Sequence, residues 1–379
     1  MIEAGDFLSA AKRQGIDFFT GVPCSFLTPL MNAVISDREA RYVGATSEGE
    51  AVAIAAGAWC AGRETVVMFQ NSGLGNAVNP LTSLNHPFAI PTLVIATWRG
   101  EPGVKDEPQH ELMGQITPQL LALAGVHGEP FPLAAADIEP VLSRAIAHMR
   151  ATGQPVGLVQ PKGAIAPRPL DEVRAEPAPR VAPVDFGGAG LPRRMDVLAL
   201  LRDKLPESAG LVATTGHTGR ELFTLQDHAG HLYCVGSMGG ASAIGLGAAL
   251  NCEREIAVLD GDGAALMKLG NMATIGAEAP ARYTHVLLDN GRHLSTGGQA
   301  TVSAHVDFAS VAAACGYRFA ARARGLAEAG AALDAALAVP GPRFVHVKVA
   351  AEEVAGLGRP TVAPREVARR FRAHLTGAA

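Results

Sequence analysis

The stretch Ile256–Asn271, IAVLDGDGAALMKLGN, runs from an apolar strand pattern through two aspartates set between glycines into a helical pattern. In an open parallel sheet, ligands gather beyond the carboxyl ends of the strands, which is where Asp260 and Asp262 fall. The glycines let backbone N–H groups approach an anion, and the following helix offers its positive N-terminus. Because the aspartates alone would repel a diphosphate, the loop predicts a hard cation between carboxylate and phosphate.

Further ligands for such a cation stand at the end of the next strand pattern. The run YTHVLLD ends at Asn290-Gly291-Arg292, one crossover helix after Asp262, and therefore at the same edge of the sheet. Asn290 can supply an amide oxygen and Arg292 a backbone carbonyl, both of which suit a hard cation. A single turn of this kind is common, but the two motifs at this spacing favour a metal site.

The rest of the chain predicts two α/β domains, each a mostly parallel sheet flanked by helices, without a middle domain. Its 379 residues with 48% hydrophobic content suffice for two ordinary cores. We expect domains over residues 1–166 and 195–379, joined by a Pro-rich linker over 167–194, and a basic amphipathic surface helix near the end, PREVARRFRAHL. The expected strands are IDFFTG, ARYVGA, ETVVMFQ and PTLVIATW in the first domain, and GLVATTG, HLYCVG, REIAVLDGDG, YTHVLLDN, GYRFAA and RFVHVKVA in the second.

Charge and cysteine usage exclude several classes of protein. The net charge is −4 with scattered Lys and Arg, so no basic field is available for nucleic acid or an anionic membrane surface. The five cysteines are odd in number and form no CxxC pair, which favours reduced thiols over disulfides or structural zinc. No targeting segment or membrane-spanning run is evident. We therefore expect a cytoplasmic protein without nucleic-acid or membrane partners.

The GDG motif followed one βα unit later by an asparagine resembles the metal-binding motif of thiamin-diphosphate enzymes. The resemblance implies a pyrimidine-binding first domain, a diphosphate-binding second domain, and thiamin diphosphate with Mg²⁺ as cofactors. It assigns the metal to Asp262, Asn290 and Arg292. In CVGSMGGASAIGLGAAL it implies that the Gly236 carbonyl binds the cofactor's exocyclic amine and that Met238 is the apolar wedge between its rings. The other cofactor-binding candidates are Glu48, Gly216, His217, Gly261, Gly263 and Ala264.

The first domain should then supply a carboxyl group to the pyrimidine ring. In TSEGEAVAIAAGAW, Glu48 begins an Ala-rich helix, as in the pyrimidine domains of thiamin-dependent decarboxylases. A carboxyl in an apolar pocket has a raised pKa and can assist generation of the cofactor's carbanion. Glu50 is less favoured because it lies one step inside the helix. We interpret NSGLGNAVNP, an incomplete dinucleotide motif, as a turn that lines the pyrimidine side of the site.

The chain resembles the phosphonopyruvate and sulfopyruvate decarboxylases over nearly its whole length. The resemblance lies in the plan without a middle domain and in the stretches GVPCSFLTPL, RGEPGVKDEPQHELMG, TTGHTGRELF and DNGRHLSTGGQATVS. It implies a carbon–carbon lyase that converts 3-phosphonopyruvate to phosphonoacetaldehyde and CO₂ in phosphonate biosynthesis. Two alternatives stay open. The substrate could be sulfopyruvate, or the protein could be a carboligase that transfers the enamine intermediate left after decarboxylation to an acceptor. The resemblance also implies a homodimer or a dimer of dimers with sites at the subunit interface.

Groups that grip a substrate with about three negative charges should lie near the cofactor. Ser25 falls at an expected helix N-terminus, either as an anion site or as a plain helix cap. The loop 99–113 has the composition of a mobile segment that closes over substrate. Its His110 is the first candidate for proton donor after CO₂ leaves, with a solvated loop histidine as the alternative. The candidates are Ser25, Lys105, His110 and Arg292 for substrate binding, and Glu48, His110 and His293 for catalysis.

Overall fold

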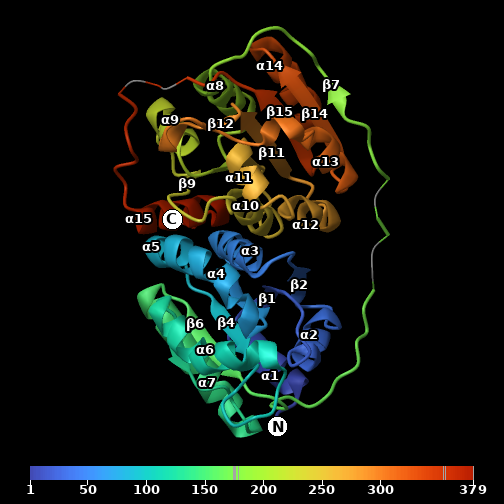
Figure 1. Cartoon of the computed structure of the whole chain (residues 1–379), viewed down its shortest axis with the longest axis vertical. Helices are drawn as coiled ribbons and strands as arrows, with labels where there is room; N and C mark the ends of the chain where they lie inside the picture. Colours follow the sequence, from blue (N-terminus) through green and yellow to red (C-terminus); the bar gives the residue numbers. More distant parts are fainter. Residues whose placement is uncertain (174–175, 178, 353, 355, 379) are drawn as a thin grey trace. The chain divides into compact units, whose positions relative to one another are not determined.

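The computed structural model describes residues 1–173, 176–177, 179–352, 354 and 356–378. The chain divides into two compact units, Met1–Ala175 and Glu176–Ala379, each built on its own sheet with helices on both sides (Figure 1). The boundary between the units falls inside the predicted linker.

The first unit alternates strands and helices along its length. Its elements are α1 (Ala4–Arg13), β1 (Ile16–Gly21), α2 (Thr28–Ile35), β2 (Arg41–Gly44), α3 (Glu48–Cys60), β3 (Glu64–Phe69), η1 (Asn71–Gly73), α4 (Leu74–Pro80), η2 (Leu81–Asn85), α5 (His86–Phe88), β4 (Leu93–Thr97), η3 (Pro108–His110), α6 (Glu111–Leu123), β5 (His127–Glu129), α7 (Ala135–Thr152) and β6 (Val156–Gln160). The strands pair in parallel in the order β2-β1-β3-β4-β6-β5.

Both faces of this first sheet are buried. Val66 and Met68 of β3 pack in a core with α1, α2 and α7, whereas Val67 and Phe69 of the same strand face α3, α4 and α6. Successive side chains of a strand point to opposite faces, so a sheet covered on both sides needs a continuous apolar run. This explains why ETVVMFQ carries no polar alternation.

The sequence analysis missed β5 and β6. In β6 a glycine interrupts a short apolar run, and prolines flank the run on both sides at Pro155 and Pro161, features that weaken the propensity of an isolated strand. In the structure β6 pairs with both β4 and β5 and is mostly buried. Its position inside the sheet therefore overrides its weak local signal.

The second unit repeats the α/β architecture with a wider sheet. Its elements are β7 (Val184–Asp185), α8 (Arg194–Lys204), β8 (Gly210–Ala213), α9 (His217–Leu225), β9 (His231–Tyr233), α10 (Ala241–Ala249), β10 (Ile256–Gly261), α11 (Asp262–Met267), α12 (Asn271–Glu278), β11 (Tyr283–Asp289), β12 (Arg292–His293), η4 (Leu294–Thr296), β13 (Gln299–Ala300), η5 (Ser303–His305), α13 (Phe308–Ala314), β14 (Phe319–Arg324), α14 (Leu326–Leu337), β15 (Arg343–Lys348) and α15 (Pro364–Thr376). The main sheet is parallel in the order β7-β14-β15-β11-β10-β8-β9, and β12 and β13 form a separate antiparallel ribbon.

Two segments at the margins of this unit add to the predicted picture. The predicted linker contains β7, which pairs with the edge strand β14. The terminal helix α15 is amphipathic, as predicted: Val367, Phe371 and Leu375 are buried, and the helix packs against β8 and β9. The parallel α/β architecture predicted for both halves is confirmed.

Each sheet has a point where the chain reverses its direction of strand addition. In the second unit β9 lies on one side of β8 and β10 on the other, and in the first unit β2 and β3 flank β1 in the same way. Ligand crevices form at such points, beyond the carboxyl ends of the strands. β10 and β11 are parallel neighbours, so the GDG and Asn290 loops lie at one sheet edge, as predicted.

The state of the cysteines and the lengths of the helices can be compared with the expectations from the sequence. All five cysteines are free thiols. No helix among the described residues combines the length and apolar character needed to cross a bilayer.

Candidate active site

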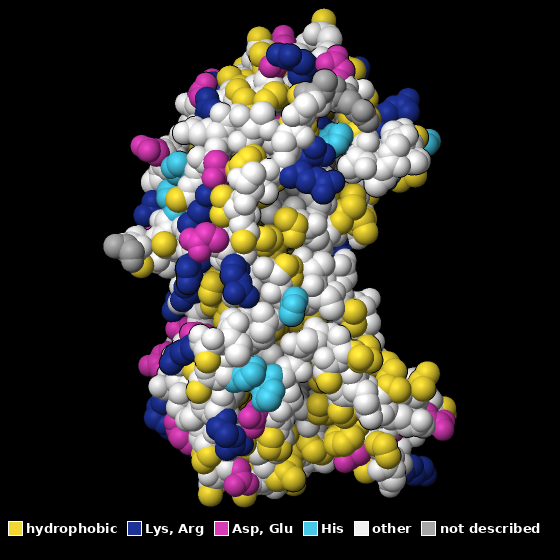
Figure 2. Space-filling view, turned by 90° about the vertical axis from the view of Figure 1, so that its left-hand side faces the viewer, with side chains coloured by type: hydrophobic (Ala, Val, Ile, Leu, Met, Phe, Trp, Pro, Cys, Tyr) yellow, Lys and Arg dark blue, Asp and Glu magenta, His cyan; other side chains and the backbone are white. Residues whose placement is uncertain are grey.

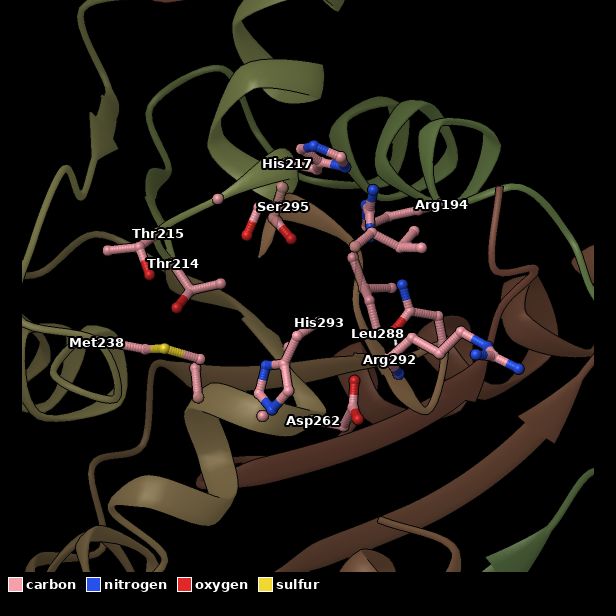
Figure 3. A pocket seen from close by; sticks show the side chains of 17 residues that line it. Arg194, Thr214, Thr215, His217, Met238, Asp262, Leu288, Arg292, His293 and Ser295 are labelled. Carbon is pink, nitrogen blue, oxygen red and sulfur yellow. Dashed lines mark hydrogen bonds between the residues drawn. The ribbon is translucent and has the colours of Figure 1, made fainter. Parts of the chain in front are cut away.

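A cavity at the carboxyl ends of β8, β10 and β11 brings together most of the site residues predicted for the second unit (Figure 3). Gly236 does not line it and lies two positions before Met238, in the loop after β9. The predicted residues that line the cavity are Gly216, His217, Met238, Gly261, Asp262, Gly263, Ala264, Asn290, Arg292 and His293.

The two aspartates of the GDG loop have different surroundings. Asp260 is fully buried and accepts hydrogen bonds from the Gly261 N–H at 3.0 Å and, at 3.2 Å, shares one with His285 Nε2. Asp262 lies in the cavity and accepts a hydrogen bond from the Thr301 hydroxyl. Burial raises the pKa of Asp262; the Thr301 hydroxyl opposes this, and the nearby Asp289 charge adds to it. A cation beside Asp262 would relieve the cost of its buried charge.

A hydrogen-bonded hairpin holds the other candidate metal ligands. Asn290 Oδ1 accepts a hydrogen bond from the Arg292 N–H at 2.9 Å, and the Thr301 N–H donates to the Gly291 carbonyl at 2.9 Å. Below the loop, Asp289 accepts hydrogen bonds from the Gly291 N–H, Ser303 Oγ, His346 Nε2 and Lys348 Nζ. Burial raises the pKa of Asp289, but His346 and Lys348 outweigh it and hold the value at about 2.

The three candidate metal ligands of the cavity are all oxygen donors. No cluster of three or more His, Cys, Asp or Glu side chains suited to a metal occurs in the described part of the chain. The cavity instead offers the Asp262 carboxylate, the Asn290 amide and the Arg292 carbonyl, a mixed oxygen set that suits Mg²⁺ better than Zn²⁺. The Arg292 guanidinium is directed away from Asp262 and donates to the Gly298 carbonyl at 3.0 Å (Figure 3).

Gly263 explains why the motif needs a glycine after Asp262. A Cβ at this position would lie 2.5 Å from His293 Cε1 and 3.4 Å from Met238 Cε. Figure 3 shows the His293 ring between Met238 and Asp262. The glycine therefore lets these two side chains reach the start of α11. Gly216, directly before α9, has φ +92°, a backbone conformation that favours glycine.

Several lining residues were missed by the sequence analysis. Thr214, Thr215, Thr218 and Ser295 add hydroxyl groups to the wall, and the position of TTG after a predicted strand was the signal that could have found the first two. Arg194 lines the cavity and forms a buried two-point ion pair with Glu221 of α9, at 2.5 and 3.0 Å. No local pattern predicts this pair, because its members lie on different helices.

In the first unit, Glu48 and Glu50 begin α3 in different roles. Ser47 caps the helix by accepting a hydrogen bond from the Glu50 N–H at 3.3 Å. Glu50 Oε2 accepts from the Thr46 N–H at 2.5 Å and from Thr46 Oγ1 at 2.6 Å, so it is tied to the helix start. Glu48 is 9% exposed, and its Oε2 accepts a hydrogen bond from Asn76 Nδ2 at 2.8 Å.

The segment NSGLGN lies directly against Glu48. A Cβ at Gly73 would lie 2.0 Å from Glu48 Oε1, so only glycine leaves room for the carboxyl in this position. Asn76, in the next helix α4, supplies the amide donor. Gly73 and Asn76 were not among the predicted site residues, although the glycine-rich segment was interpreted as lining the pyrimidine side of the site.

The prediction that Ser25 lies at a helix N-terminus is wrong. Helix α2 begins at Thr28 with Leu27 as its cap, and Ser25 lies exposed in the preceding turn. It therefore neither caps the helix nor presents the helix N–H groups. The Ser25 hydroxyl accepts a hydrogen bond from Arg99 Nη1 at 3.4 Å.

The loop after β4 is shorter and more tightly bound than predicted. Helical structure resumes at Pro108, so the expected irregular segment does not extend to residue 113. Asp106 accepts hydrogen bonds from Arg99 Nη2 at 2.6 Å, Arg99 Nε at 2.7 Å and the Gly100 N–H at 2.9 Å. Lys105 is exposed. His110 is only 5% exposed, and its Nδ1 has no hydrogen-bond partner among the described residues, which excludes the alternative of a solvated loop histidine.

The Arg99–Asp106 pair predicts a pH-dependent stability of this unit. Arg99 holds the pKa of Asp106 well below its usual range, so the stabilisation is present above the unfolded value near about 3.9 and is lost as pH falls below it. We expect Asp106→Asn to lower the free energy of unfolding by about 2 kcal/mol at pH 7, with the difference between variant and wild type shrinking progressively as pH falls below about 4. Denaturant titration followed by tryptophan fluorescence reports this unit alone, because Trp59 and Trp98 are the two tryptophans of the chain. A difference independent of pH would contradict the assignment.

Comparison with known proteins identifies the class to which this fold and site belong. The model of the thiamine pyrophosphate enzyme N-terminal TPP binding domain matches residues 3–121, and that of the C-terminal TPP binding domain matches residues 215–347. Together the two matches define a thiamine pyrophosphate enzyme, and they confirm the predicted fold class of two cofactor-binding domains.

Full-length relatives narrow the class. The chain is 48% identical to the phosphonopyruvate decarboxylase of Streptomyces viridochromogenes over 99% of its own length and 96% of the relative. It is 30% identical to the sulfopyruvate decarboxylase of Methanosarcina acetivorans over 96% and 95% of the two chains. The benzoylformate decarboxylase structure from Polynucleobacter necessarius shares the fold, with a TM-score of 0.73 at 14% identity, covering 93% of this chain and 100% of that one. The chain belongs to the phosphonopyruvate decarboxylase family of thiamine pyrophosphate enzymes.

Proposed function

We propose that this protein removes CO₂ from 3-phosphonopyruvate and releases phosphonoacetaldehyde, as a thiamin-diphosphate- and Mg²⁺-dependent carbon–carbon lyase of phosphonate biosynthesis. The observation that carries the proposal is the 48% identity to a phosphonopyruvate decarboxylase over nearly the whole of both chains. The 30% identity to a sulfopyruvate decarboxylase, also nearly full-length, makes sulfopyruvate the second candidate substrate.

The residues of the second unit fit the cofactor. Asp262, Asn290 and the Arg292 carbonyl would hold Mg²⁺, whose charge would compensate the buried Asp262 carboxylate. Met238 would be the apolar wedge, and the Gly236 carbonyl would accept a hydrogen bond from the exocyclic amine. The residues proposed to bind the diphosphate are Gly216, His217, Gly261, Gly263 and Ala264. When bound, thiamin diphosphate supplies the nucleophile and the electron sink for decarboxylation.

Side chains of the protein are proposed to carry out the proton transfers of the reaction. We propose that Glu48 exchanges a proton with the pyrimidine ring nitrogen, with Asn76 fixing the direction of its carboxyl group. His110 and His293 are the candidates to deliver a proton to the product after CO₂ leaves. Two observations support them: His110 Nδ1 is buried without a partner among the described residues, and the His293 ring lines the cavity beside Asp262. The roles of Ser25, Lys105 and Arg292 in holding the substrate stay predictions.

We further propose a homodimer, or a dimer of dimers, in which sites lie at subunit interfaces. The proposal rests on the family resemblance, and it is tested by mixing two inactive variants, Glu48→Gln and Asp262→Ala, after separating and reassociating their subunits. If each site combines the first unit of one chain with the second unit of its partner, mixed dimers contain one intact site and activity returns to about a quarter of wild type. Sites confined to one chain would give no recovery.

The substrate is tested directly. The protein, with thiamin diphosphate and Mg²⁺, is offered 3-phosphonopyruvate and 3-sulfopyruvate separately, and both CO₂ and the aldehyde product are measured. We expect a higher kcat/KM for phosphonopyruvate. A preference for sulfopyruvate would select the second candidate, and product formation that requires an added acceptor aldehyde would instead identify a carboligase.

The packing of Gly73 against Glu48 gives a prediction with a matched control. We expect Gly73→Ala to displace the Glu48 carboxyl and to lower kcat by about 10- to 100-fold, because small misplacements of a catalytic group have effects of this size. Gly75, two positions further on, has open space around it, so Gly75→Ala should leave kcat unchanged. Steady-state kinetics of both variants, with circular dichroism as a folding check, makes the comparison. Equal kinetics for the two would disprove a role for the Glu48 position.

A further inference from the structure

A second cavity, of about 390 Å³, adjoins the cofactor cavity within the second unit. The two cavities share Gly216, His217 and Ser295 as lining residues, so they adjoin at these three residues. The second cavity is walled by α9, by the chain after β9, and by the C-terminal segment 359–364. Figure 2 views the molecule from the side on which α9 and α15 lie in Figure 1, and it shows basic side chains in dark blue on this unit.

The charged groups of this cavity are all positive. Arg220 and Arg359 line it, and no Asp or Glu does. Neither arginine forms an ion pair with an acidic residue in the described part of the chain. This distinguishes them from Arg194 and Arg99, which are neutralised by Glu221 and Asp106. Two uncompensated guanidinium groups beside a cofactor site create a positive potential that favours an anionic ligand.

Arg220 also fixes the wall that carries Arg359. Its Nε donates to the Gly358 carbonyl at 2.9 Å and its Nη2 to the Leu357 carbonyl. These bonds hold the backbone immediately before Arg359 to α9, which begins at the cofactor cavity. Arg359 is exposed, so its guanidinium is accessible to a small ligand that enters from solvent.

We propose that this second cavity receives the phosphonate group of the substrate and that Arg359 is a specificity-determining residue that binds it; the inference rests on the proposed function. A guanidinium suits phosphonate oxygens because it can donate two parallel hydrogen bonds. Placing the cation at the phosphonate also suits decarboxylation. Holding the non-reacting phosphonate by charge supplies binding energy, while the carboxylate that must leave is not stabilised by the same cation.

The test compares Arg359→Ala and Arg359→Lys with Arg365→Ala, a control that removes an exposed arginine of α15 lining neither cavity. For Arg359→Ala we expect KM for 3-phosphonopyruvate to rise about 10- to 100-fold with kcat changed less than about 3-fold. Arg359→Lys should fall between Arg359→Ala and wild type. Ethylphosphonate, which has no carboxylate, should lose potency as a competitive inhibitor by a similar factor, whereas inhibition by pyruvate should not change. Arg365→Ala should match wild type in all these measurements.

The outcomes separate this inference from the proposed function. If the wild-type protein releases no CO₂ from 3-phosphonopyruvate, the proposed function fails, and the inference with it. If wild type is active but Arg359→Ala has an unchanged KM and unchanged inhibition by ethylphosphonate, only the inference is overturned. A loss of pyruvate inhibition equal to that of ethylphosphonate would also overturn it, since Arg359 would then not distinguish the phosphonate. Should Arg359→Ala fold poorly, Arg359→Gln gives the same comparison with less loss of side-chain volume.

Discussion

Replacing Glu48 with glutamine should lower turnover by about 10²- to 10⁴-fold, the range expected when a general acid–base group is lost. The amide matches the carboxyl in size and can still accept the hydrogen bond from Asn76 Nδ2, so the local packing should persist. It cannot exchange a proton with the pyrimidine ring. Thiamin diphosphate should therefore bind the variant nearly as well as wild type, which isothermal titration calorimetry in the presence of Mg²⁺ would measure beside kcat.

Glu50→Gln is the matched control because Glu50 lies on the same helix, two positions further on. Its carboxylate is engaged by the Thr46 N–H and hydroxyl, so we expect a loss of about 1 kcal/mol in stability with kcat changed only slightly. Wild-type turnover in Glu48→Gln, or an equal loss in both variants, would remove Glu48 from the mechanism.

Replacing Asp262 with alanine should prevent stable formation of the holoenzyme. Asp262 supplies the carboxylate among the three proposed metal ligands, and its loss should weaken the Mg²⁺-dependent binding of thiamin diphosphate by at least about 100-fold. The thermal stability of the apoprotein should fall little or even rise, because a buried carboxylate with a raised pKa is removed. Calorimetric titration of thiamin diphosphate at several Mg²⁺ concentrations measures the effect.

Asp260→Asn provides the contrast within the same loop. Asp260 bonds to the Gly261 N–H and to His285 inside the fold and does not line the cavity. This variant should lose about 1–3 kcal/mol of stability while the Mg²⁺ dependence of cofactor binding is retained. Unchanged cofactor affinity in Asp262→Ala would show that the metal is held elsewhere.

The sequence predicted the features of this protein that depend on local patterns. Buried parallel strands are continuous apolar runs, which the sequence shows directly. Two of these runs are followed by glycines with acidic or amide residues, and this pattern predicted that both loops lie at one sheet edge. The GDG and Asn290 loops meet there in the structure. Helix boundaries near Ser25 and at Pro108 were less predictable, because turns and short 3-10 segments have weak signals.

Contacts between distant segments could not be read from the sequence. Arg194 reaches Glu221 from another helix, and Gly73 is a required glycine because of Glu48, which precedes it in the chain by a strand and a helix. Arg359 lies in a Pro/Gly-containing segment that has no periodicity to mark it. Its place in a cavity wall is known only from the folded chain, where Arg220 binds the carbonyls of the two preceding residues.

The wall formed by residues 359–364 has a practical consequence for protein engineering. These residues follow the last strand of the sheet, so most of them can be exchanged without altering the strands and loops that line the first cavity. A library confined to residues 359–362 would vary the side chains offered to the phosphonate end of the substrate, while Ala363 and Pro364, the cap and the first residue of α15, stay unchanged.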